Sequence, residues 1–194
     1  MEAILASFAL VFLAEMGDKT QLLAFSLAAR FKKPWPILAG ILVATLFNHA
    51  LAAAVGTWVS THVPAKILGL VLGLGFIAFA IWTLIPDTHA DDGKPPKYGP
   101  FVTTTVLFFF AEMGDKTQLA TAALAARFGN LILVVAGTTA AMMAADGLAV
   151  LLGERLSRWL SPVWMRRVAA ALFLITGVWT LFETFRGAVH PAVT

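Results

Sequence analysis

AEMGDKTQL occupies residues 14–22 of this chain and occurs again, unchanged, at residues 111–119. Each copy lies within a long apolar stretch, where two carboxylates and a lysine are costly to place. The second copy begins 97 residues after the first, and with that offset the two halves of the chain align without a gap. Residues 12–31 and 109–128 are identical at 15 of 20 positions. The chain therefore contains an internal duplication.

The composition is that of an integral membrane protein. Of the 194 residues, 59% are hydrophobic and 13% are charged, whereas soluble domains carry about 25% charged residues. The mean hydropathy is +0.83. There are no cysteines, which excludes a disulfide framework, a thiolate zinc site and a cysteine nucleophile. The basic residues are scattered over short connectors, which argues against a nucleic-acid partner.

Six segments are apolar enough for transmembrane helices of about 20 residues. They cover residues 2–30, 35–57, 65–86, 100–127, 131–153 and 163–185. The first and fourth contain the motif, and each is either a tilted helix or a helix broken near Gly17 or Gly114. With the N-terminus outside, the cytoplasmic connectors hold nine Lys and Arg residues and the outer regions hold three. Because basic residues favour the cytoplasmic side, we predict that both termini lie outside.

The duplication also predicts how the spans are arranged. Three spans are an odd number, so the second copy enters the membrane from the opposite side. We therefore expect an all-α integral membrane protein with six transmembrane helices as two inverted three-helix repeats. The first repeat covers residues 1–87, a cytoplasmic loop covers 88–99, and the second repeat covers 100–194. Inverted repeats are typical of secondary transporters, whose substrate sites lie near the membrane midplane.

The charged residues of the two motifs form a candidate metal site. On a continuous helix, Glu15 and Asp18 are three residues apart and share one face. Together with their lysines, the two motifs carry a residual charge of −2, which one divalent cation would neutralise. We expect four carboxylates to bind the cation: Glu15, Asp18, Glu112 and Asp115.

Other polar residues of the motifs are expected to support this site. Amide and hydroxyl oxygens would complete a hard, oxygen-only site that suits Ca²⁺, Mg²⁺ or Mn²⁺. The supporting residues are Gln21, Gln118, Thr20, Thr117, Lys19 and Lys116. Gly17 and Gly114 allow either close helix packing or a local break.

Alternatives remain for several of these groups. Buried ion pairs within one helix, such as Glu15–Lys19, would hold helices together without transport; two copies at matching depth favour a transport site. Asp146 is either a proton relay, an extra ligand or a partner in an inter-helix hydrogen bond, and Asn48 is a further candidate ligand. His49 is interpreted as a packed or hydrogen-bonded histidine. A cation and protons would compete for the same carboxylates, as cation/proton antiport requires.

The motif E-x-G-D-K-T, present at residues 15–20 and 112–117, closely resembles the Gdt/MneA-type family of manganese and calcium transporters. The resemblance covers essentially the whole chain. It implies a metal-site role for the four motif carboxylates, Mn²⁺ or Ca²⁺ as the transported ion, H⁺ as the coupling ion and no permanently bound cofactor. The compact loop and the absence of a targeting extension are typical of a bacterial member of the inner (plasma) membrane.

The leading hypothesis is a secondary transporter that exports Mn²⁺, with Ca²⁺ as a second substrate, by alternating access. Its partners would be the divalent metal ion and the lipid bilayer, and the sequence leaves the oligomeric state open. A passive divalent-cation channel would share the acidic lining. An intramembrane aspartyl protease would use Asp18 and Asp115, which both follow a glycine. Such a protease needs two carboxylates and leaves the accompanying Glu and Lys unexplained.

Overall fold

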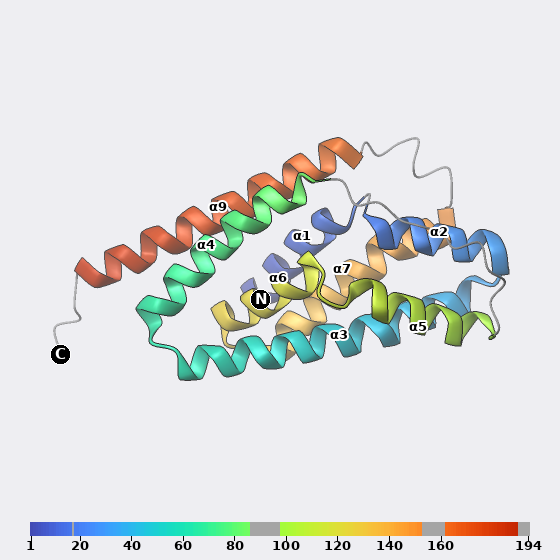
Figure 1. Cartoon of the computed structure of the whole chain (residues 1–194), viewed down its shortest axis with the longest axis horizontal. Coiled ribbons are helices and arrows are strands. Elements are labelled where there is room, and N and C mark those ends of the chain that lie inside the picture. The colour runs from blue at the N-terminus through green and yellow to red at the C-terminus, as the bar shows by residue number, and fades with distance from the viewer. Residues whose placement is uncertain (17, 86–97, 153–161, 190–194) are drawn as a thin grey trace.

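The protein is all-helical over the residues that the computed structural model describes, which are 1–16, 18–85, 98–152 and 162–189. These ranges contain eight helices and no strand. The helices are α1 (Glu2–Glu15), α2 (Lys19–Phe31), α3 (Pro34–His62), α4 (Ala65–Thr83), α5 (Pro100–Glu112), α6 (Lys116–Phe128), α7 (Leu131–Leu152) and α9 (Pro162–Val189). Figure 1 shows α4 and α9 side by side along one edge and α3 along the opposite edge. Nearly all of the predicted loop 88–99 lies outside the described residues.

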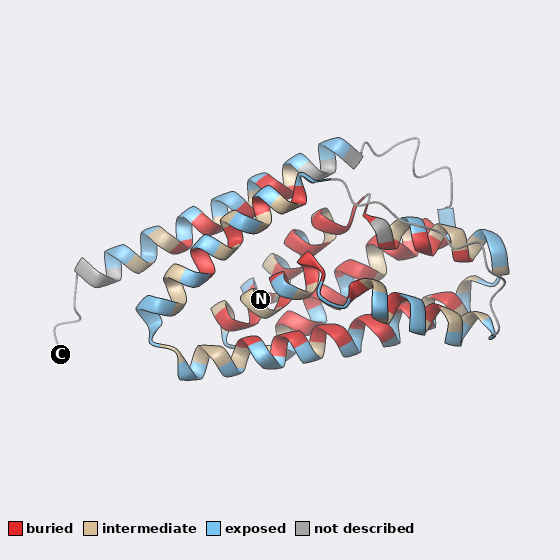
Figure 2. Cartoon of the chain, viewed as in Figure 1, coloured by how far each residue is buried: buried red, intermediate tan, exposed pale blue. Residues whose placement is uncertain are grey.

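Four helices are long and apolar enough to cross a membrane: α3, α4, α7 and residues 167–186 of α9. Their outer surfaces are apolar as well. On α3, for example, Phe47, Leu51 and Val55 are exposed, and pale exposed positions run along the outside of the bundle in Figure 2. Large exposed apolar surfaces of this kind mark contact with lipid. The prediction of an all-helical membrane protein is confirmed.

The two motif-bearing segments are broken helices. α1 ends at Glu15 and α2 begins at Lys19, and between them Met16 and Asp18 have extended backbone angles. The same break separates α5 from α6, where Gly114 has a φ of +77°. Glycine adopts this left-handed conformation without the steric cost that a Cβ imposes. The continuous helix that would place Glu15 and Asp18 on one face is therefore wrong, and the alternative of a break is correct.

The first motif segment packs against α7 as the second packs against α3. Gly40 of α3 lies so close to α5 that a methyl group there would be 2.8 Å from the carbonyl oxygen of Phe101 and 2.8 Å from Cβ of Thr104. Gly137 of α7 makes the equivalent contact with Ile4 and Ser7 of α1. Each residue of the second contact differs from its counterpart by 97 positions, since 40, 101 and 104 correspond to 137, 4 and 7. The same helix crossing is thus made twice.

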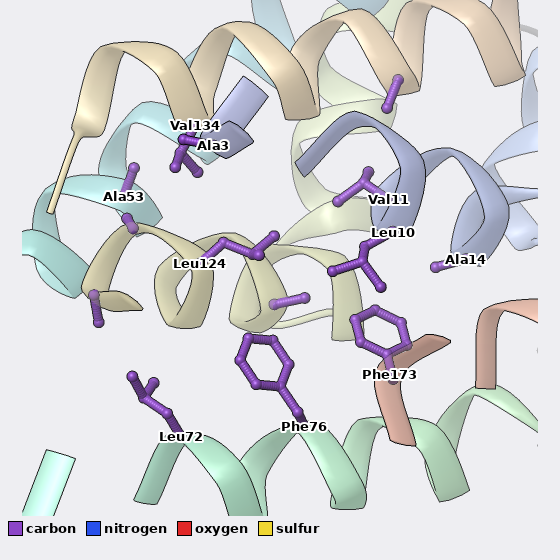
Figure 3. Packing of buried hydrophobic residues seen from close by; sticks show 14 of the residues in the cluster. Ala3, Leu10, Val11, Ala14, Ala53, Leu72, Phe76, Leu124, Val134 and Phe173 are labelled. Atoms are coloured by element: carbon purple, nitrogen blue, oxygen red, sulfur yellow. The ribbon is translucent and has the colours of Figure 1, made fainter. Parts of the chain in front are cut away.

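A hydrophobic core joins these crossings to the α4–α9 pair. Phe76 of α4 and Phe173 of α9 are stacked with ring centroids 6.3 Å apart. Both rings pack in one cluster with Val11 of α1 and Leu124 of α6 (Figure 3). This cluster ties α4 and α9 to the helices that flank the breaks, so it fixes the position of the charged residues between them.

Candidate functional site

The two motif copies meet in the interior through an ion pair. Lys116, at the start of α6, places its Nζ 2.8 Å from Oδ1 of Asp18, at the start of α2. The side chains are only 3% and 1% exposed. Because the partners come from different motifs, the pair joins the two halves of the chain at their breaks. The sequence did not indicate this ion pair, since the pair that the sequence suggested, Glu15–Lys19, lies within one motif.

Each break also fixes a glutamate through a threonine of the next helix. The hydroxyl of Thr20 donates to Oε2 of Glu15 at 2.9 Å, and that of Thr117 donates to Oε2 of Glu112 at 3.0 Å. All four side chains are fully buried. The threonines therefore hold the carboxylates in position. Their predicted role of lending oxygens to a metal stays a prediction.

The second oxygen of each glutamate is buried and unsatisfied over the described residues. Oε1 of Glu15 and Oε1 of Glu112 are buried and have no hydrogen-bond partner within the described ranges. Buried polar atoms are nearly always hydrogen-bonded, so each exception calls for an explanation. A carboxylate oxygen that is held in place and desolvated is a suitable ligand for a hard cation.

Asp146 lies with these acids. Its carboxylate, on α7, is fully buried and interacts electrostatically with Glu15 and Asp18, and Glu112 interacts with it in turn. Glu15 also interacts electrostatically with Glu112. Neither carboxylate oxygen of Asp146 has a hydrogen-bond partner among the residues that the structure describes. The structure thus brings Asp146 to the motif acids, and the hydrogen bond considered as its alternative role is absent over the same residues.

The amide side chains make hydrogen bonds around the two breaks, and their predicted role at the metal site stays a prediction. Gln21 donates from Nε2 to the carbonyl oxygen of Ala145 at 3.1 Å, which links α2 to α7 next to Asp146. Oε1 of Gln118 accepts from the backbone N–H of Gly114 at 2.6 Å and so braces the second break. Asn48 of α3 donates to the carbonyl oxygen of Phe109 in α5 at 3.0 Å.

Asp115 has a structural contact of its own. Its Oδ1 accepts from the backbone N–H of Lys116 at 2.6 Å, and it caps the first turn of α6.

Gly17 and the side chain of Lys19 lie outside what the structure describes. Over the described residues, no three His, Asp or Glu side chains are arranged to hold a metal ion. In this arrangement Asp18 is paired with Lys116.

Comparisons with known proteins match nearly the whole chain. The family described as divalent cation/proton antiporter GDT1 matches it twice, over residues 3–91 and over residues 100–188. A Vibrio cholerae protein named "Putative manganese exporter" is 43% identical over 183 residues, which are 94% of this chain and 92% of that protein.

Plant proteins are more distant relatives. GDT1-like protein 5 of Arabidopsis thaliana is 27% identical over 93% of this chain and 96% of its own length. Protein PAM71-homolog, a chloroplastic protein of the same plant, is 30% identical over 93% of this chain and 59% of its own length. No solved structure matches the chain. The duplicated motif, the apolar helices and these matches agree, and the chain belongs to the GDT1 family of divalent cation/proton antiporters, which are transporters and not enzymes.

Proposed function

We propose that this protein exports Mn²⁺ from the cytoplasm in exchange for protons, with Ca²⁺ as a second substrate. The bacterial relative whose name states manganese export supports the choice of ion. The observation that carries the proposal is the pair of glutamates at the two breaks. Each has one oxygen held by a threonine and one that is buried without a hydrogen-bond partner among the described residues.

The proposed site combines the acids of both motifs. Glu15, Asp18, Glu112 and Asp115 would bind the cation, and Asp146 would join them from α7. The electrostatic interactions among these acids support their convergence on one ion. Repulsion between buried carboxylates is relieved by a divalent cation or by protons. The two kinds of ion therefore compete for the same oxygens, and that competition would couple their movements.

Lys116 would take part in the exchange. Its ammonium group neutralises Asp18 in the described arrangement, at a distance of 2.8 Å. An entering cation would displace this group and take its place beside Asp18. When the cation leaves, the ion pair would form again and prevent Asp18 from remaining charged and alone in the interior. The lysine would thus stand in for the metal in the part of the cycle without metal.

The architecture we propose is two inverted repeats, residues 1–87 and 100–194, with α1–α2 and α5–α6 each crossing the membrane as a broken helix. The equivalent contacts of Gly40 and Gly137 support a pseudo-twofold relation between the repeats. Broken helices around a midplane site are typical of secondary transporters. Rocking of one repeat against the other would alternate access, with both termini outside in the inner membrane of a bacterium.

Transport into proteoliposomes tests the proposal. Mn²⁺ flux and internal pH are recorded together, with and without an imposed pH gradient. We expect saturable flux that depends on the gradient and is lost in Glu15→Gln and in Glu112→Gln. Glu183→Gln is the matched control, since Glu183 is an exposed glutamate of α9. Undiminished flux in the first two variants would refute the site, and flux that neither saturates nor moves protons would favour the channel.

A further inference from the structure

His49 is a buried polar residue that the proposed site does not use. It lies in the middle of α3 and is fully buried. Neither ring nitrogen has a hydrogen-bond partner within the described part of the chain. Leaving a buried polar group without a partner costs about 1–3 kcal/mol. His49 is therefore packed, as one of its two interpretations has it, and is not hydrogen-bonded to the residues described. Its two nitrogens still need an explanation.

The packing of α3 places His49 beside the second break. α3 runs in the same direction as α5 and α6, because Gly40 contacts Phe101 whereas Gly56, farther along, contacts Ala122 of α6. His49 precedes Gly56 by seven residues, or two helical turns, and so lies on nearly the same face. Counting back seven residues from Ala122 gives Asp115. His49 therefore lies level with the start of α6.

Two neighbours of His49 on α3 also place it at the height of the second motif. Asn48 donates to the carbonyl oxygen of Phe109, three residues before Glu112. Ala53, one turn after His49, packs in the same core cluster as Ala120 and Leu124 of α6 (Figure 3). The hydrogen bond lies before the break, and the shared cluster includes residues of α6 after the break. His49 is thus held between them, at the height of the second motif.

The repeat gives His49 a counterpart of known position. Adding the offset of 97 to 49 gives 146, and Asp146 lies beside Glu15 and Asp18 of the first motif. The repeat therefore gives His49 of α3 and Asp146 of α7 equivalent positions, one in each half of the chain. They differ in chemistry, since α7 offers a carboxylate where α3 offers an imidazole.

We propose that His49 supplies a nitrogen ligand to the transported cation at the second motif and so selects Mn²⁺ over Ca²⁺ and Mg²⁺. Calcium and magnesium take oxygen ligands almost exclusively. Imidazole is a ligand of first-row transition ions, so one nitrogen in an otherwise oxygen-lined site penalises the alkaline-earth ions relative to manganese. This inference rests on the proposed function, because it concerns the ion that the motif acids bind.

Pulsed electron paramagnetic resonance of bound Mn²⁺ tests the ligand directly. The purified full-length protein is loaded with one equivalent of Mn²⁺ alone, and nitrogen modulation of the electron spin echo is recorded. We expect a ¹⁴N signal that changes to ¹⁵N when the protein is made with ¹⁵N-histidine, a measurement that needs no mutation. The signal should disappear in His49→Gln and remain in His62→Gln, an exposed histidine at the end of the same helix.

Competition between ions provides the functional readout. In proteoliposomes, we expect His49→Gln to lower the preference for Mn²⁺ over Ca²⁺ about tenfold, in the range that loss of a metal-site contact produces. Calcium flux should persist, whereas a merely structural role would lower both fluxes together. Bound Mn²⁺ without a histidine signal, in a wild-type protein that transports it, would overturn this inference alone. A wild-type protein without Mn²⁺ flux would overturn the proposed function and this inference with it.

Discussion

Lys116 and Asp18 are 98 residues apart in the chain, and they form an ion pair of 2.8 Å whose two side chains are almost completely buried. Each residue begins or caps the helix that follows a break. Burying two charges is costly even when they are paired, and removing one partner leaves the other uncompensated. The pair therefore makes the folding of each motif depend on the other.

Lys116→Met is expected to destabilise the protein by about 3–5 kcal/mol, because Asp18 loses its buried counter-charge. Thermal unfolding in detergent measures the loss. The double variant Lys116→Met/Asp18→Asn should recover much of it, since neither charge remains. As a control, Arg127→Met breaks a pair of 3.7 Å with the exposed Glu183 and should cost less than about 1 kcal/mol through that pair. Equal stabilities for wild type and Lys116→Met would contradict the importance of the pair.

Thr20→Val and Thr117→Val are each expected to raise the KM for Mn²⁺ about tenfold, as loss of an outer-shell contact to a metal ligand does. The change keeps the volume of the side chain but removes the hydroxyl that holds Oε2 of the adjacent glutamate. Initial rates of flux measure the KM. Thr20→Ser keeps the hydroxyl and should behave like the wild type, so an equal effect of serine and valine would show that the hydrogen bond is irrelevant.

Gly114→Ala is expected to destabilise the protein by about 1–2 kcal/mol and to reduce flux. The φ of Gly114 is +77°, and open space surrounds it, so the cost arises from the backbone and not from a clash. Gly75→Ala provides the control, since that glycine also faces open space but lies within α4 and has no positive φ. There alanine should be neutral or stabilising, by up to about 1 kcal/mol. Thermal unfolding of both variants makes the comparison.

The predicted orientation can be tested by cysteine labelling, because the chain contains no cysteine of its own. Thr61→Cys lies at an exposed position in the last turn of α3, and Asn130→Cys lies in the exposed connector between α6 and α7, and we place both outside. Lys33→Cys lies in an exposed connector that we place in the cytoplasm. A membrane-impermeant maleimide applied to intact cells should label the first two variants only. Labelling of Lys33→Cys alone would reverse the orientation, and labelling of all three would contradict the six-span arrangement.

The sequence predicted the parts of this structure that depend on composition and repetition. The helical membrane class follows from the apolar segments, and the importance of residues 14–22 and 111–119 follows from their duplication. Whether the helices break at Gly17 and Gly114 was left open for a physical reason. A glycine inside a helix costs only about 1 kcal/mol, so tertiary contacts decide whether the helix continues.

The specific contacts of the site depend on how distant segments pack, and the sequence does not contain that information in a local pattern. Nothing in the spacing of the motif indicates that Lys116 binds Asp18 of the other copy, nor that Gln118 turns back to Gly114. His49 could have been found, because its repeat counterpart is the buried acid Asp146. This correspondence alone does not place His49 near the second motif. The contacts of Gly40 and Gly56 show which part of α3 lies beside the second break.

The breaks also bring helix dipoles into the centre of the molecule. α1 and α5 end at Glu15 and Glu112, so their partially negative ends face the interior, and neither helix has a basic residue in its last turn. The partially positive ends of α2 and α6 begin at Asp18 and Asp115, whose carboxylates compensate them. The main-chain ends at Glu15 and Glu112 therefore add to the negative field of the carboxylates. In the proposed site, backbone and side chains together would favour a cation, and the side chains would decide which cation is bound.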